Sequence, residues 1–194
     1  MLHGIFLSLI ILIFVVAFFV IDFWFMYQYD PERSNRKGWS WDYTLFTIVL
    51  GIAVILQPWL LPSVGWTTSH PIGLAIQFVG FIVLASSLII HAWARRYLRQ
   101  FYVERVEIQE NHRVIRSGPY EYVRHPIITT FFGFAVGLFM INPSLVTILI
   151  ATYTFWDFSR AARQEEELLS QFLPEYAEYM RTTPRFIPSL RKKT

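Results

Sequence analysis

The sequence predicts an all-α protein that is embedded in a membrane. Its 194 residues are 54% hydrophobic and 18% aromatic, which is too apolar for an ordinary soluble domain of this length. The apolar residues lie in long runs, and the first, Leu2–Tyr27, contains a single charge, Asp22. At about 1.5 Å per residue, this run can span a bilayer core of roughly 30 Å. It has neither a basic start nor a small-residue cleavage site after it, so we expect a membrane helix rather than a signal peptide.

Four further membrane helices are predicted from the remaining apolar runs. Tyr43–Leu61 forms the second and Pro71–Trp93 the third. The run Ile127–Phe158 is too long for one typical span and is interrupted at Asn142-Pro143-Ser144, a strong turn signal. We therefore expect a C-terminal helical hairpin with two short arms that are tilted or partly buried in protein. The sequence predicts about five transmembrane helices in one membrane domain.

The distribution of positive charge predicts the orientation. Lys and Arg gather in Asp30–Trp41, in Ala94–Arg124 and in the C-terminal tail, whereas residues 62–70 and 142–144 contain none. By the positive-inside rule, the N-terminus lies outside and the basic segments lie in the cytoplasm. The net charge of +3 then follows from topology and contact with anionic lipid, so no nucleic-acid partner is expected. The single domain, 1–194, is expected to divide into three membrane helices (1–93), a cytoplasmic connector (94–125), the hairpin (126–158) and a cytoplasmic helix and tail (159–194).

Several kinds of chemistry are excluded. The chain has no cysteine, so it has no disulfide, thiol nucleophile or Cys-ligated metal. It has no phosphate-binding glycine-rich loop and no Rossmann fingerprint. His112 and His125 are too far apart for a local metal motif and have no suitably spaced acidic partner, so no metal site is expected.

The informative polar residues lie in two segments, Arg95–Arg124 and Arg160–Arg185. In the second, Arg163 and Glu167 have the i,i+4 spacing of a solvated helical ion pair, which would contribute about 0.2–0.5 kcal/mol. The alternative is that arginine and carboxylate face the Arg124-His125 edge and enclose a polar ligand. Sequence alone leaves both interpretations open.

These segments resemble a known family. The ordered combination of "QENHRVIRSGPYEYVRHP", an Asn-Pro helical hairpin and "RQEEELL…EYAEYMRTTPRFIP" is similar to the isoprenylcysteine carboxyl methyltransferases and to related phospholipid and small bacterial membrane methyltransferases. The likeness covers Gln109 to Pro188. It implies a membrane enzyme that takes a methyl group from S-adenosyl-L-methionine and leaves S-adenosyl-L-homocysteine. In the family the cofactor lies in a cytoplasmic pocket at the ends of the last helices.

The resemblance also implies which residues form the site. A substrate-side arginine would be Arg163 or Arg160, and Glu166 joins them in the expected catalytic set. Two departures bear on this set. Ile128 stands where family members commonly have a tyrosine, and the register of the acidic cluster leaves open which arginine and which glutamate face the pocket. The implied cofactor contacts are Gln109, His112, Arg113, Val114, Ile115, Tyr120, His125, Pro126, Glu165 and Glu166.

The favoured reaction is carboxyl O-methylation of an isoprenylcysteine-like group on a lipophilic or amphiphilic substrate. N-methylation of a phospholipid amine and S-methylation of a small thiol are the alternatives, and a non-enzymatic membrane scaffold is the alternative of another class. The sequence says nothing about the oligomeric state. Outside the motifs, Asp22 is expected either to reach the interface or to pair with an arginine. Gln77 and His91 are candidates for lining a lipid-side cavity.

Overall fold

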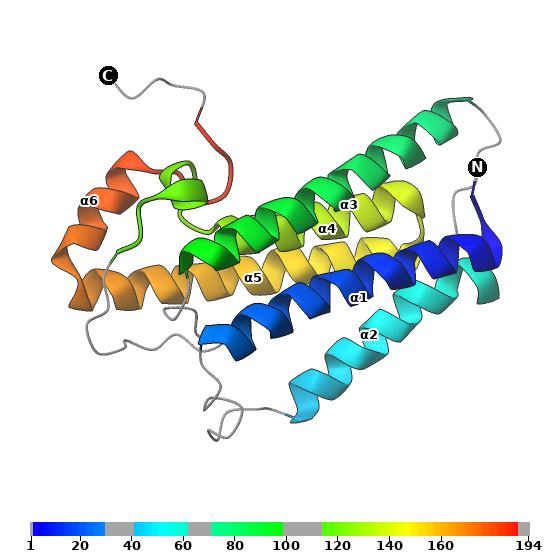
Figure 1. The fold of residues 1–194 in the computed structure, drawn as a ribbon, viewed down its shortest axis with the longest axis horizontal. Coiled ribbons are helices and arrows are strands. Elements are labelled where there is room, and N and C mark those ends of the chain that lie inside the picture. The colour runs from blue at the N-terminus through cyan, green and yellow to red at the C-terminus, as the bar shows by residue number, and fades with distance from the viewer. Residues whose placement is uncertain (1, 30–40, 62–70, 99–113, 190–194) are drawn as a thin grey trace.

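A computed structural model describes residues 2–29, 41–61, 71–98 and 114–189, and it contains no β-strand in those ranges. The described residues form a bundle of long helices, with two short helices gathered at one end (Figure 1). The elements are α1 (Gly4–Tyr29), α2 (Trp41–Leu60), α3 (Pro71–Leu98), the 3₁₀ helix η4 (Gly118–Glu121), α4 (Pro126–Ile141), α5 (Leu145–Phe172) and α6 (Pro174–Thr182).

Each apolar run that predicted a helix forms one, and the hairpin prediction is confirmed. The first arm ends at Ile141, and Asn142 follows it as the C-cap. Ser144 then begins the second arm through a capping box, in which its hydroxyl accepts from the Thr147 amide at 3.2 Å and the Thr147 hydroxyl accepts from the Ser144 amide at 3.0 Å. The second arm is longer than predicted, because α5 continues unbroken through residue 158 to Phe172 and has 28 residues. The helix expected after the hairpin therefore begins as an extension of this arm.

Two of the described helices are long and apolar enough to cross a membrane. They are Gly4–Phe25 and Pro71–Leu98, whereas Gly51–Leu60 and Pro126–Ile141 are apolar but shorter. Length and composition therefore support two spans, and the count of five stays a prediction. The outward faces of α1 and α3 carry exposed apolar side chains, including Phe6, Ile13 and Phe78, which fit a lipid environment better than water.

The tightest packing in the bundle lies between α3 and α4. A Cβ added at Gly80 of α3 would stand 2.6 Å from a side-chain carbon of Ile141, and one added at Gly137 of α4 would stand 2.8 Å from Leu84. Small residues permit such close approach, which is the usual basis of helix association in membranes. Leu7 and Ile11 of α1 complete the buried core against this pair.

Polar side chains join the helix ends on the side where α1 and α3 begin. The side-chain amide of Gln77 donates to the carbonyls of Leu2 and Ile141, both at 3.0 Å, and its oxygen accepts from the Leu2 amide at 2.9 Å. The Asn142 amide donates to the side-chain oxygen of Gln57. Gln77 is therefore buried in a junction of chain segments rather than lining a lipid-side cavity.

At the opposite end, the chain returns to the start of α4. The backbone amides of Arg124 and His125 donate to the carbonyls of Pro184 and Arg185 at 2.9 and 3.1 Å. The Thr129 hydroxyl donates to the Phe186 carbonyl at 3.1 Å. We call Thr183–Phe186 the C-terminal strap. The strap lies near α6 at this end of the bundle (Figure 1).

Candidate functional site

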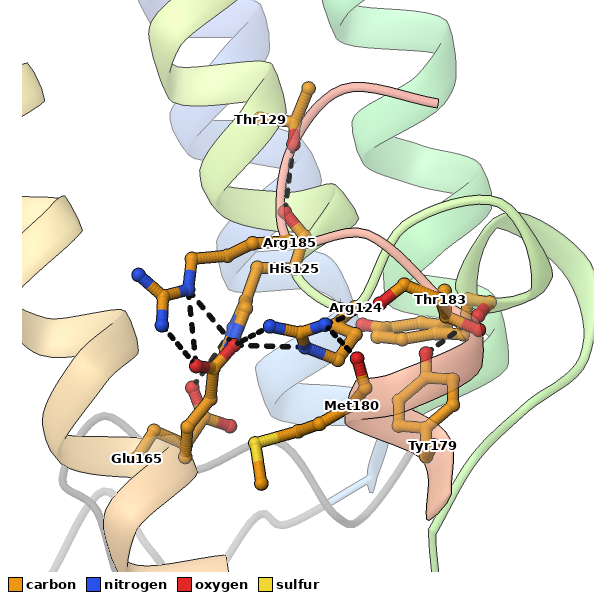
Figure 2. A network of polar contacts seen from close by, with 10 residues as sticks. Arg124, His125, Thr129, Glu165, Tyr179, Met180, Thr183 and Arg185 are labelled. Atoms are coloured by element: carbon orange, nitrogen blue, oxygen red, sulfur yellow. Dashed lines mark hydrogen bonds and ion pairs between the residues drawn. The ribbon is translucent and has the colours of Figure 1, made fainter. Parts of the chain in front are cut away.

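A buried glutamate on α5 is the centre of the polar end. The Glu166 side chain is 5% exposed and faces two arginines and a histidine from other segments. Arg124 donates to it from Nε at 2.9 Å, and His125 Nε2 lies 3.0 Å from the same Oε1. Arg185 of the C-terminal strap donates from Nε to both oxygens at 3.0 Å and from Nη2 to Oε2. Figure 2 shows the three side chains converging on α5.

Local sequence explains how this edge is built. Pro126 occupies the first position of α4, where its missing N–H costs no helical hydrogen bond, and His125 precedes it as the N-cap. Gly118 adopts a φ of +63°, which begins the sharp Ser-Gly-Pro turn into η4. The turn buries Tyr120 against Ala94 of α3 and Ile127 of α4. The carbonyl of Tyr120 then accepts a hydrogen bond from the Tyr179 hydroxyl at 2.5 Å.

Charge at the edge is set by competition between burial and pairing. Burial alone would raise the pKa of Glu166, but hydrogen bonds from His125, Arg185 and Arg124 outweigh it and hold that pKa well below its usual range. Burial alone would lower the pKa of His125, but Glu165 and Glu166 outweigh it and raise that pKa. Burial raises the pKa of both Tyr176 and Tyr179, so these hydroxyls remain donors at neutral pH. The edge therefore holds an ionised carboxylate and a histidine that favours its charged form.

The structure brings together four of the residues that the family resemblance implied. Tyr120, His125, Pro126 and Glu166 are all buried at this edge. Glu165 lies beside them with a 43% exposed side chain, and its Oε2 is 3.4 Å from His125 Nδ1.

The connector residues contribute less to this edge in the described chain. The Val114 amide donates to the Glu175 carboxylate at 3.4 Å, and Ile115 packs against the cluster of Tyr120. The predicted contacts Gln109, His112 and Arg113 lie outside the described residues.

The two arginines expected on the substrate side do not contact Glu166. Arg160 and Arg163 both have exposed side chains, and Arg160 stands 6.0 Å from the ring of Trp156. Within the described part of the chain Arg163 makes no ion pair, and the surface pair with Glu167 that its spacing permits is not formed.

The arginines that do contact Glu166 are Arg124 and Arg185. Sequence reasoning placed Arg124 only at the edge of the hydrophobic segment and gave Arg185 no role. The available signal was the position of Arg185 inside "TPRFIP", where flanking prolines favour an extended segment rather than a surface helix.

Comparisons with known proteins agree with the family resemblance. Residues 78–171 match the model of the isoprenylcysteine carboxyl methyltransferase (ICMT) family. Over this segment the chain is similar to the family. The protein-S-isoprenylcysteine O-methyltransferase of Schizosaccharomyces pombe is 33% identical over 81 residues, which is 41% of this chain and 34% of that protein.

Bacterial proteins with other names are also similar to the chain. The cobalt-zinc-cadmium resistance protein CzcN of Cupriavidus metallidurans is 35% identical over 83 residues, 42% of this chain and 38% of that protein. The nickel-cobalt-cadmium resistance protein NccN of Alcaligenes xylosoxydans is 28% identical over 120 residues, 61% of this chain and 53% of that protein. The chain thus spans about half the length of these relatives or less. Among the described residues, no group of three or more His, Cys, Asp or Glu side chains could hold a metal ion.

The ICMT-like segment contains the core of the site but not all of it. Tyr120, His125, Glu165 and Glu166 lie within residues 78–171. Arg185 and the rest of the C-terminal strap lie beyond this segment, and α1 precedes it.

Proposed function

We propose that this protein is a membrane-embedded methyltransferase that uses S-adenosyl-L-methionine to methylate a lipophilic or amphiphilic substrate. The observation that supports this most directly is the buried Arg124–His125–Glu166 cluster at one end of the bundle, inside the segment that matches the ICMT family. Five membrane helices with the N-terminus outside would place this cluster and the C-terminus in the cytoplasm. A hydrophilic cofactor would then enter from the cytoplasm and the apolar substrate from the bilayer.

The residues at this edge fit such a cofactor. Its binding would supply an activated methyl group on a sulfonium centre. Glu165 is the better-placed carboxylate to accept from its ammonium or ribose, because the oxygens of Glu166 already accept from two arginines and lie against His125. The ring of Tyr120 is buried against Ala94 and Ile127, which makes an apolar wall next to the start of α4. Gln109, His112 and Arg113 remain proposed contacts from the connector, together with Val114 and Ile115.

In the proposed reaction, the residues of the chain position the nucleophile and hold charged groups in place. A carboxylate nucleophile needs no base, and an exposed arginine can orient it, so we assign this role to Arg163, with Arg160 as the alternative. An amine nucleophile must lose a proton, and Glu165 is then the carboxylate with an exposed face. Glu166 fixes Arg124 and His125 in either case. Carboxyl methylation of an isoprenylcysteine-like group is the favoured reaction.

Binding and transfer can be measured on the purified, detergent-solubilised protein. Titration with S-adenosyl-L-homocysteine should release heat and raise the melting temperature as the ligand passes its dissociation constant. Radiolabelled S-adenosyl-L-methionine, offered with a farnesylcysteine analogue, a phosphatidylethanolamine or a small thiol, should label the first most strongly. A folded protein that neither binds the homocysteine at millimolar concentration nor labels any acceptor contradicts the proposal.

Variants separate the two candidate arginines. Replacing Arg163 by alanine should lower transfer roughly ten- to a hundred-fold, as expected for losing a charge-assisted contact worth about 1.5–3 kcal/mol. Arg160→Ala tests the alternative. Arg181→Ala is the matched control, because Arg181 is an exposed helical arginine of α6 that pairs with exposed Glu178. If both Arg160→Ala and Arg163→Ala behave like Arg181→Ala, neither arginine orients the substrate.

A further inference from the structure

The only charge in α1, Asp22, is held by two basic side chains of α3. Arg95 donates to Asp22 Oδ1 from Nε at 2.7 Å and also from Nη2, and His91 Nε2 lies 2.6 Å from the same oxygen. His91 is fully buried and Arg95 is 4% exposed. The expectation that Asp22 pairs with an arginine is confirmed. An acid in an apolar membrane helix is costly unless it is paired, so its presence points to a role.

His91 also contacts α4. Its Nδ1 lies 2.9 Å from the Thr130 hydroxyl, which donates to the Ile127 carbonyl at 2.6 Å. The imidazole also packs at 4.2 Å between centroids on the ring of Phe18. It is 0% exposed and so is a buried side chain between helices rather than the lining of a lipid-side cavity.

The contacts then reach the candidate site. Ile127 packs with Ala94 and Tyr120, and Ala94 directly precedes Arg95 in α3. Ile127 follows Pro126 at the start of α4, so its carbonyl lies within the first turn behind His125. A continuous path of hydrogen bonds and packed side chains thus runs from Asp22 to the residues around the proposed cofactor contacts.

We propose that Asp22 is a positioning residue of the site: through His91 and Thr130, it fixes α3 and the first turn of α4, and with them Tyr120 and His125. This inference rests on the proposed methyltransferase function and adds to it a residue that lies outside the ICMT-like segment. Apolar contacts alone specify the sliding and rotation of helices poorly, whereas a shared carboxylate with directional donors specifies one arrangement. A displacement of about 1 Å at the reacting centre is enough to lower a rate about a hundred-fold.

The test uses the full chain in detergent or nanodiscs and two variants on this path, Asp22→Asn at its start and Thr130→Val between His91 and Ile127. Ser8→Ala is the matched control, since Ser8 is a buried polar residue of the same helix whose hydroxyl has no hydrogen-bond partner in the described chain. Transfer from radiolabelled S-adenosyl-L-methionine to the best acceptor is measured per folded molecule, with kcat and KM determined separately. Asp22→Asn and Thr130→Val should each lower kcat/KM at least tenfold, and Ser8→Ala should not.

The double variant decides between positioning and plain stabilisation. If Asp22 and Thr130 act through one path, the losses in kcat/KM should be strongly non-additive, so the double variant is close to the worse single variant. The inference is overturned if the single variants melt earlier but transfer methyl groups at the parental rate per folded molecule. It is also overturned if the loss of kcat/KM in the double variant equals the product of the two single losses. A folded parent protein that neither binds S-adenosyl-L-homocysteine nor transfers a methyl group overturns the proposed function itself. If the parent binds and transfers but the variants do not show the expected losses, only the role of Asp22 is overturned.

Discussion

Neighbouring glutamates of α5 have different environments and should have different roles. Glu166 is 5% exposed and bonded to two arginines and a histidine. The Glu165 side chain is 43% exposed, and its Oε2 lies 3.4 Å from His125 Nδ1. Removing one member of a buried charge cluster leaves the others uncompensated, which costs about 3–5 kcal/mol. An exposed carboxylate contributes little to stability but remains available to a ligand.

Glutamine substitutions should separate these roles. Glu166→Gln should lower the free energy of unfolding by several kcal/mol, on the scale of about 3–5 kcal/mol, because Arg124 and Arg185 lose their shared counter-ion. Glu165→Gln should leave unfolding nearly unchanged but weaken S-adenosyl-L-homocysteine binding roughly tenfold or more. Denaturant melts in detergent and calorimetry measure the two quantities. The reverse pattern, with Glu165 controlling stability, would rule out this division.

The same cluster predicts how stability depends on pH. The raised pKa of His125 means that its contribution is fully present below about pH 6.5 and is lost as pH rises through the folded-state value. The lowered pKa of Glu166 means that its contribution is present above about pH 4.5 and is lost as pH falls towards the folded-state value. The contribution of His125 and Glu166 to the free energy of unfolding, measured across pH, should be greatest between about pH 4.5 and about pH 6.5.

Replacing His125 by glutamine tests the assignment of the alkaline side. Glutamine can still donate to Glu166 but does not titrate, so His125→Gln should flatten the loss of stability above about pH 6.5 and leave the acid side in place. An unchanged alkaline slope would mean that another group titrates there.

At the scale of the element, the 3₁₀ helix η4 depends on one glycine. Gly118 has a φ of +63°, and an added Cβ would stand 2.7 Å from the ring of Tyr97. Gly118→Ala should therefore cost about 1–2 kcal/mol from the backbone alone, and it should displace Tyr120 and weaken cofactor binding. Gly51→Ala in α2 is the matched control, because nothing lies within 4 Å of its added Cβ and alanine favours a helix. Equal melting and equal binding for the two variants would contradict this account.

The helices could be predicted from the sequence because their causes are local. The capping box of Ser144 and Thr147 spans four residues, and the apolar runs of α1 and α3 are continuous. The partners of Glu166 could not be predicted, because Arg124 lies 42 residues away and Arg185 lies 19 residues away in another segment. A family motif gave the residues near His125, but only the fold shows which side chain meets which.

The pairing of Asp22 shows the same limit more clearly. Sequence showed a lone acid in an apolar helix, and therefore a need for a partner. The sequence alone does not show whether Asp22 reaches the interface or pairs with one of many arginines. Its partners His91 and Arg95 lie 69 and 73 residues away in the chain. The packing of α1 against α3 brings these partners to Asp22.

At the scale of the whole molecule, the polar site and the apolar outer surface divide the protein by environment. The C-terminal strap and α6 lie at one end, and the start of α1 lies at the other (Figure 1). The Glu166 cluster is at the strap end, because Arg185 of the strap donates to Glu166. Exposed apolar side chains such as Ile13, at 66% exposed, cover the helices between them. A bilayer that surrounds these helices would leave the two ends in different compartments.

The absence of cysteine from the chain allows a direct test of this arrangement. We expect Ser189→Cys to react with a membrane-impermeant maleimide only from the cytoplasmic side, and His3→Cys only from the opposite side, as the positive-inside rule requires. Ile13→Cys should resist the reagent from both sides, because a thiol within the hydrocarbon core neither ionises nor meets the probe. Detergent-solubilised, unfolded protein supplies the control in which all three positions react.

Labelling of Ser189→Cys from outside would reverse the proposed orientation. Rapid labelling of Ile13→Cys in intact membranes would show that α1 does not lie within the bilayer.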